Sequence, residues 1–250
     1  MGDGHGILCR RSRPRNRPFT TAPYRTDMET YVVRVWLPDR PGALGQVTSR
    51  IGAVRGEIVG IDILERAAGR AIDELAVQLP DASLVDLLVS EIRAVDGVDV
   101  EEIRAVDGAT HDPRADALET AAIIVGAADR QDLLDAVVTH GRRVLGGAWA
   151  AVVQVDEGAV FAVDGEAPPA PWLTAFVEGS RAAAAVGETA ESGPDDVVWA
   201  PLPAAGLSIV VGRVGSGFRA RERRQVAALA RIADTRLLDF VRRAHPSAQR

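Results

Sequence analysis

A turn that leads into a helical pattern is the part of this sequence whose residue types could bind a ligand. The residues of this turn are Asp39, Arg40, Pro41 and Gly42. Proline fixes its own φ near a helical value, aspartate can cap a helix, and glycine lets the backbone approach a bound group. The backbone N–H groups of Gly42, Ala43 and Leu44 would then lie at a helix N-terminus. Unpaired donors and the helix dipole favour an anion there, such as a carboxylate.

A ligand that also carries an ammonium group would need an acceptor opposite this helix start. Asp39 and Glu57 are the candidates, because we expect the strand that opens at Glu57 and Ile58 to begin beside the loop. A carboxylate side chain can only accept hydrogen bonds. The alternative is purely structural: Asp39 caps the helix and Glu57 pairs with a surface arginine.

The elements that would position this loop follow from apolar periodicity. Alternating apolar residues predict strands, and apolar residues three and four apart predict the buried faces of helices. We expect strands at 31–37, 57–65, 70–79 and 98–104, and helices with buried stripes at 44–54 and 84–95. The order strand, helix, strand, strand, helix, strand is that of a ferredoxin-like α+β fold, βαββαβ.

The run Asp-Arg-Pro-Gly-Ala-Leu at 39–44, followed by a helix, Gly56 and an isoleucine-rich strand, resembles the ACT domain. ACT domains are small amino-acid-sensing modules of regulated amino-acid enzymes, and the resemblance covers roughly residues 30–105. It implies that an amino acid binds between two such domains, with its carboxylate near the start of the first helix, and that the chain forms a homodimer or another homo-oligomer. Relatives that bind amino acids often carry asparagine where this chain has Asp39 and Glu57, and a polar residue at Leu37.

The second half of the chain has a different pattern of elements. Helices are expected at 112–127, 129–145 and 172–186, strands at 148–155, 159–163, 197–202 and 207–213, and a long helix at the end. This order resembles a GAF domain over roughly 112–243, which implies a central antiparallel sheet with helices. The half lacks the lysine of cyclic-nucleotide-binding members and the cysteine of bilin-binding members. The resemblance therefore implies a degenerate GAF-like domain with a scaffold or dimerisation role.

These patterns divide the chain into four segments. We expect a disordered basic tail at 1–27, an ACT-like domain at 28–108, a linker at 109–113 and a GAF-like domain at 114–245. The tail carries six arginines against two aspartates and has no apolar periodicity. Met28 directly precedes the first strand, so an alternative is that translation begins there and the tail is not made.

Composition excludes several kinds of chemistry. All 29 basic residues are arginine, so lysine Schiff bases and lysine-containing phosphate loops are impossible. The four histidines and the single cysteine have no metal-ligand spacing, so we expect no metal site and no cofactor. We also expect the carboxylate pairs 73–74, 101–102 and 195–196 to lie on the solvated surface. The last helix should present a basic face to solvent or to a partner, and residues 215–217 should be a plain loop.

These observations predict a non-enzymatic regulatory protein. It would have no catalytic residues and would bind an amino acid or a related small molecule at the ACT-like interface, signalling through dimer geometry or a protein partner. The alternative is a ligand-free scaffold for oligomerisation or interaction. The excess of acidic residues disfavours nucleic acid as a partner, the absence of a long apolar run disfavours a membrane, and a lone cysteine suits a reducing cytoplasmic setting.

Overall fold

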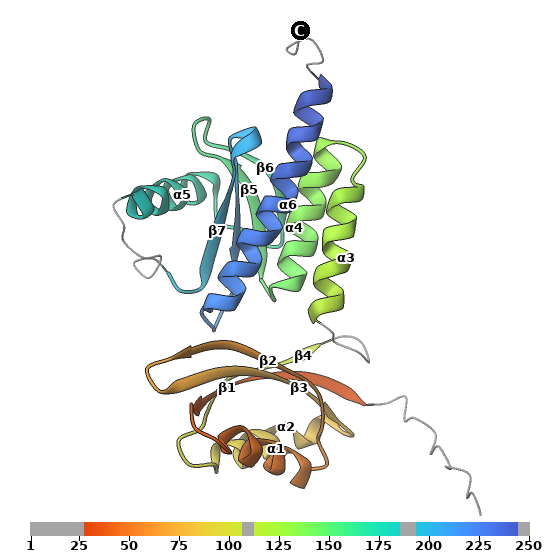
Figure 1. The fold of residues 1–250 in the computed structure, drawn as a ribbon, viewed down its shortest axis with the longest axis vertical. Coiled ribbons are helices and arrows are strands. Elements are labelled where there is room, and N and C mark those ends of the chain that lie inside the picture. The colour runs from red at the N-terminus through yellow and green to blue at the C-terminus, as the bar shows by residue number, and fades with distance from the viewer. Residues whose placement is uncertain (1–27, 107–112, 186–193, 245–250) are drawn as a thin grey trace, which may run out of the picture.

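The computed structural model describes residues 28–106, 113–185 and 194–244. These residues form two units, each built on a four-stranded antiparallel sheet. Figure 1 shows the N-terminal unit (28–106) below the C-terminal unit (113–244), with the N-terminal sheet between its own helices and the C-terminal unit. The mixed α+β class is therefore confirmed. The tail at 1–27 and residues 109–112 of the expected linker lie outside the described residues, and the proposed domain boundaries stay predictions.

The N-terminal unit has the βαββαβ order expected from periodicity. Its elements are β1 (Glu29–Pro38), α1 (Ala43–Ala53), β2 (Glu57–Ala67), β3 (Arg70–Leu79), the short 3-10 helix η1 (Ala82–Leu84), α2 (Val85–Arg93) and β4 (Asp99–Val106). The strand order β2-β3-β1-β4 is that of a ferredoxin-like sheet, which confirms the prediction for this half. Helices α1 and α2 both lie on one face of the sheet (Figure 1).

The core of the N-terminal unit lies between this face and the two helices. One side of β1 contributes Val33, Val35 and Leu37, and the helices contribute Val47 and Leu88 among other buried aliphatic residues. The other side of β1 is also covered, because Arg34 is only 1% exposed. An antiparallel sheet commonly leaves one face to solvent, so burial on both faces shows that something covers the outer face.

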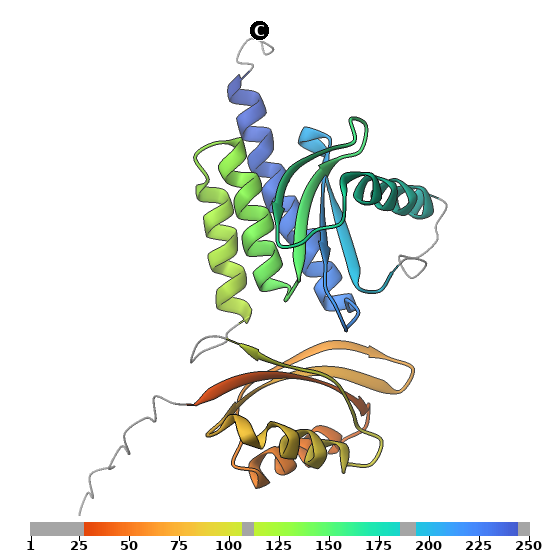
Figure 2. The same ribbon diagram turned by 180° about the vertical axis from the view of Figure 1, so that it is seen from behind.

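The cover of the outer face is the C-terminal unit. Its elements are α3 (Pro113–Gly126), α4 (Arg130–Val144), β5 (Trp149–Gln154), β6 (Ala159–Asp164), α5 (Ala170–Ala185), β7 (Val197–Leu202), the 3-10 helix η3 (Pro203–Ala205), β8 (Leu207–Gly212) and α6 (Ala220–Ala244). The strand order is β6-β5-β8-β7. Helices α3, α4 and α6 lie on one side of this sheet and α5 on the other, as Figures 1 and 2 show. A central antiparallel sheet with helices agrees with the sequence, but GAF membership stays a prediction.

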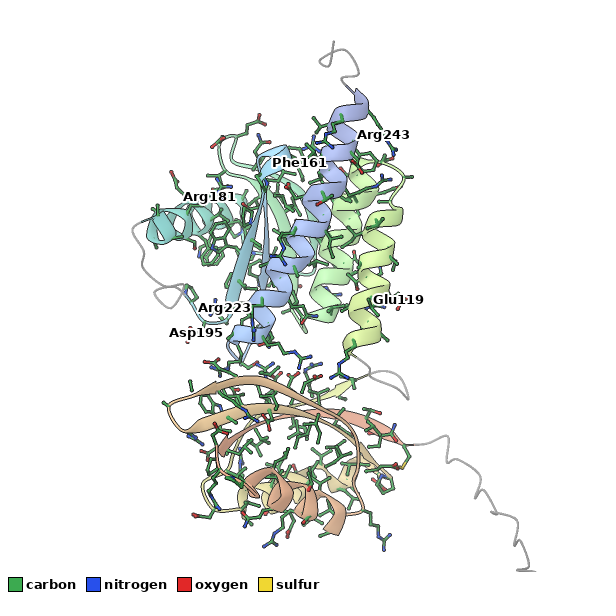
Figure 3. All side chains as sticks on the ribbon, in the orientation of Figure 1. Glu119, Phe161, Arg181, Asp195, Arg223 and Arg243 are labelled. Carbon is green, nitrogen blue, oxygen red and sulfur yellow. The ribbon has the colours of Figure 1, made fainter. Side chains whose placement is uncertain are left out.

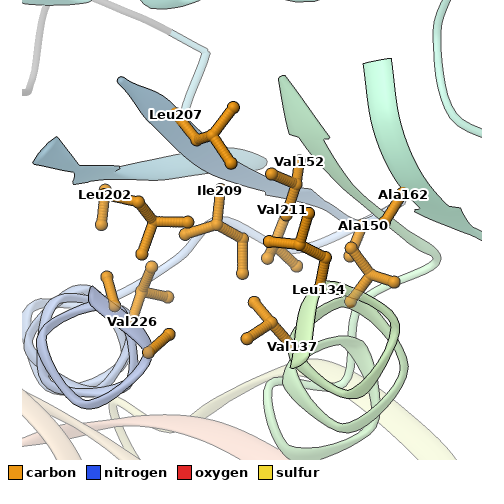
Figure 4. Close-up of a cluster of buried hydrophobic side chains, with 14 of the residues drawn as sticks. Leu134, Val137, Ala150, Val152, Ala162, Leu202, Leu207, Ile209, Val211 and Val226 are labelled. Atoms are coloured by element: carbon orange, nitrogen blue, oxygen red, sulfur yellow. The ribbon is translucent and has the colours of Figure 1, made fainter. Parts of the chain in front are cut away.

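Aliphatic side chains hold the helices of the C-terminal unit to its sheet. Leu134 and Val137 of α4 and Val226 of α6 pack against Ile209 and Val211 of β8, as Figure 4 shows. All five side chains are fully buried. The start of α6 is therefore anchored in this core and also faces the N-terminal sheet. Among the described residues, no helix is both long and apolar enough to cross a membrane.

Candidate functional site

The loop expected to bind a ligand joins β1 to α1 at one end of the N-terminal sheet. The Asp39 backbone N–H donates to the Gly69 carbonyl at 2.9 Å, which fixes the loop against the β2–β3 turn. Gly42 is the N-cap of α1 with φ 86° and ψ −11°, a left-handed conformation that favours glycine. A Cβ atom added to Gly42 would meet nothing within 4 Å. The loop therefore needs glycine for its backbone and leaves open space beside it.

The N-terminus of α1 has no anionic side chain of its own. No side chain caps it, and its first turn has no acidic residue. The structural alternative in which Asp39 caps α1 is therefore wrong; Asp39 instead lies 3.8 Å from Arg66 in an exposed ion pair, a kind that contributes little stability. The Ala43 N–H makes a long bond to the Arg40 carbonyl at 3.3 Å. The backbone N–H groups at the helix start can still bind an external anion.

The structure brings together the six predicted residues from Asp39 to Leu44 but not the other two. Arg40, Pro41 and Gly42 are exposed, Ala43 is buried, and Leu44 packs against the core. Glu57 and Ile58 begin β2 at the opposite end of the sheet. Glu57 of β2 lies opposite Gln78 of β3, and Gln78 lies opposite Thr30 near the start of β1. The loop follows Pro38, which is about 26 Å further along β1. The expectation that β2 begins beside the loop is therefore wrong for a single chain.

The structure adds Asp73, which was expected to be solvated surface. Asp73 is 3% exposed on β3, between Val35 of β1 and Ile63 of β2. Its Oδ1 atom is buried and has no hydrogen-bond partner among the described residues. Burial raises the pKa of this carboxyl, Arg66 opposes the rise, and Asp39 adds to it. The surface assignment was wrong, and strict alternation with Leu75 already placed Asp73 on the core face.

The outer face of the N-terminal sheet carries a second, larger cluster of charges around Arg34. Its Nη2 donates to Glu74 Oε1 at 2.7 Å and to Glu222 Oε1 of α6 at 3.0 Å. Its Nη1 donates to the Gly217 carbonyl at 3.1 Å. One buried guanidinium therefore binds groups from both units.

Glu222 is the matching group on the C-terminal side. It is 7% exposed and also accepts from Arg213, which is buried as well. Its other oxygen accepts from the Arg219 backbone N–H at 2.7 Å. A glutamate that bonds back to the residue preceding the helix is half of a capping box, so Glu222 also fixes the start of α6.

Further polar contacts surround this centre. Ser216 donates to Glu102 at 2.6 Å, and Glu101 accepts from Arg219. Arg221 pairs with Asp62 of β2. Figure 3 shows nitrogen- and oxygen-bearing side chains crowding the space between the N-terminal sheet and the start of α6. The expectations of a solvated 101–102 pair and a plain 215–217 loop were therefore wrong, because both segments are part of the contact between units.

No protein-family model matches the chain, and no curated protein matches it. Among similar solved structures is the ACT domain from GTP pyrophosphokinase of Chlorobium tepidum, with 19% identity, 32% of this chain, 99% of that chain and a TM-score of 0.27. The C-terminal domain of the MgtC protein from Mycobacterium tuberculosis is similar with 15% identity over 35% of this chain and 97% of that chain, at a TM-score of 0.28. An unknown protein from Galdieria sulphuraria is similar with 15% identity over 83% of this chain and 93% of that chain, at a TM-score of 0.30. The assignment of a ferredoxin-like fold rests on the strand order and register of this chain.

Asp73→Asn should stabilise the protein at neutral pH. The pKa of Asp73 is higher in the folded protein than in the unfolded chain, so ionised Asp73 opposes folding. The unfolding free energy therefore falls as the pH rises from the unfolded pKa through the folded pKa. Urea denaturation at pH 7 should give a larger unfolding free energy for the variant. Below about pH 3.5, where both states of the wild type are protonated, this gain should vanish. Equal stability of the two proteins at pH 7 would contradict the buried, unpaired state.

Arg34→Met should destabilise the protein by about 3–5 kcal/mol, because it leaves the buried Glu222 and the partly buried Glu74 without their shared cation. The control is Arg50→Met, which removes an exposed ion pair with Glu91 and should cost less than about 1 kcal/mol. Urea denaturation measures both. A loss for Arg34→Met no larger than that of the control would show that this network does not hold the two units together.

Proposed function

We propose that this protein is a non-enzymatic regulator that binds an amino acid or a related small zwitterion at the β1–α1 loop. The observation that carries the proposal is Asp73, a buried carboxylate with an unpartnered oxygen. Burying an unpaired charge opposes folding, and such a group is a candidate for function. Asp39, which influences the charge of Asp73, is in the loop that leads to the start of α1.

The two ends of a zwitterion match the two halves of this site. The ligand carboxylate would accept from the N–H groups of Gly42, Ala43 and Leu44, where α1 has no cap or acidic residue of its own. The ammonium group would bind Asp73 and Asp39, whose like charges oppose each other beside the single cation Arg66. The ligand would thus add a cation beside Asp73, whose pKa stays raised although Arg66 opposes the rise.

A second copy of the chain would complete the site along the edge of β2. Val59, Ile61 and Ile63 are 40%, 43% and 42% exposed on this edge strand. An open strand edge can pair with another strand, and a two-fold axis near Ile61 would place the two β2 strands antiparallel. Because Glu57 and the loop lie at opposite ends of the sheet, this pairing brings Glu57 and Ile58 of the second copy to the loop end of the first.

The alternative function is a ligand-free scaffold. The observation that favours it is the Arg34 network, which joins the two units without any ligand. In either case we propose a cytoplasmic protein that uses no cofactor and has protein or small-molecule partners rather than nucleic acid or membrane. The two functions differ in whether an amino acid stabilises the fold.

At least one amino acid should raise the melting temperature of the full chain. At about 100 times its dissociation constant, a ligand of the folded state adds roughly 2.7 kcal/mol of stability. Gly42→Asp should abolish the gain, because it places a carboxylate where the ligand carboxylate binds; the space beside Gly42 is open, although its positive φ makes any side chain there strained. Gly158→Asp, also at a positive φ with nothing within 4 Å but in the other unit, should keep the response. If no amino acid stabilises the wild type, the scaffold takes the place of the sensor.

Ile61→Lys should weaken self-association, because it places a charge at the centre of the expected two-fold contact. Sedimentation at tens of micromolar, on the order of the affinity of modest interfaces, should show a shift from dimer toward monomer. Leu87→Lys, at a comparably exposed position on α2, should leave the dimer intact. A wild-type monomer at these concentrations would contradict a site shared between two copies.

A further inference from the structure

We propose that the first turn of α6 in the C-terminal unit reads the state of the ligand site, through β3 and the buried Arg34. This inference rests on the proposed function, because it assigns an output to the same site. The N-terminal sheet separates the site from α6, with the helices on one face and the C-terminal unit on the other (Figure 2). Transmission therefore has to pass through the sheet.

Two adjacent residues of β3 connect the faces. Successive side chains of a strand point to opposite faces, so Asp73 lies on the helix side and Glu74 on the outer side. Glu74 Oε1 accepts from Arg34 Nη2 at 2.7 Å and from Arg34 Nε at 3.2 Å. Because the two residues share one peptide unit, a change in the position of Asp73 displaces Glu74 and its bond to Arg34.

Arg34 transfers such a displacement to α6. It donates to Glu222, which holds the Arg219 N–H at the helix start. Charged groups in a low-dielectric interior interact strongly, and their interaction energy changes with their separation. Helix α6 has 25 residues, about 37 Å in length, and runs the full height of the C-terminal unit in Figure 2. A rotation at its first turn would therefore reach the far end of that unit.

A second contact joins the β1–α1 loop to the start of α6. Trp36 lies near the end of β1, three residues before Asp39, and its ring has the Arg219 guanidinium 5.0 Å from its centroid. Arg70 stacks on the same ring at 5.1 Å. The loop and the start of α6 are thus connected through β1 as well as through β3.

Hydrogen exchange of the full chain tests this path without a ligand. Asp73→Asn keeps the shape of the side chain and removes its charge, as a bound ammonium would offset it. Amides 219–226 should exchange about fivefold more slowly in this variant, a low value for coupling between sites, relative to amides of β5 in the same unit. Asp96→Asn, an exposed carboxylate in the turn before β4, should leave amides 219–226 unchanged.

Glu222→Gln keeps the test decisive. It should speed exchange at 219–226 by about tenfold or more, since it weakens a buried charge pair. If Glu222→Gln has this effect but Asp73→Asn does not slow exchange, the contact is real and the coupling is refuted. If neither variant changes exchange there, the contact itself carries no signal and the inference also fails. Failure of the proposed function is a separate result, the absence of stabilisation by any amino acid.

Discussion

The structure depends on one buried guanidinium. Arg34 lies at the centre of the N-terminal sheet's outer face and is bound by Glu74 from its own unit and Glu222 from the other. Removing a charge from water costs several kcal/mol, and only close partners offset that cost. Because the partners come from two units, the network is satisfied in a single relative arrangement. The ion pairs therefore define how the units fit, more than they add to stability.

This arrangement gives the N-terminal sheet a different role on each face. The helix face forms the core and carries Asp73, and the outer face carries Glu74 and Arg34. Most four-stranded antiparallel sheets of this kind need only one apolar face. Here β1 and β3 carry buried residues on both sides, so both faces of these strands are in contact with packed side chains. Such a sheet would suit the regulatory function proposed above, in which the N-terminal unit acts on the C-terminal one.

Asp73 is the exception to the apolar pattern of the buried face of β3, and the proposed site rests on it. Its alternation with Ala71 and Leu75 places it toward the core, where an aliphatic residue would pack without cost. Proteins keep such violations where function requires them, and removing them often stabilises the fold. The helix start at Gly42 could be found from residue types alone, since proline and glycine have local backbone meanings. Glu57 could not be placed, because its distance from the loop depends on strand register rather than on local sequence.

The sequence by itself determined the order of elements, the βαββαβ fold of the first half and the loop before α1. These follow from periodicity and turn residues, which act over a few positions. Only the tertiary structure decided which charges are buried and with which partners. Arg34 and Glu222 are 188 positions apart, and nothing local distinguishes either from a solvated surface residue. Pairing of charges depends on distance and on exclusion of water, and both are set only when the two units pack together.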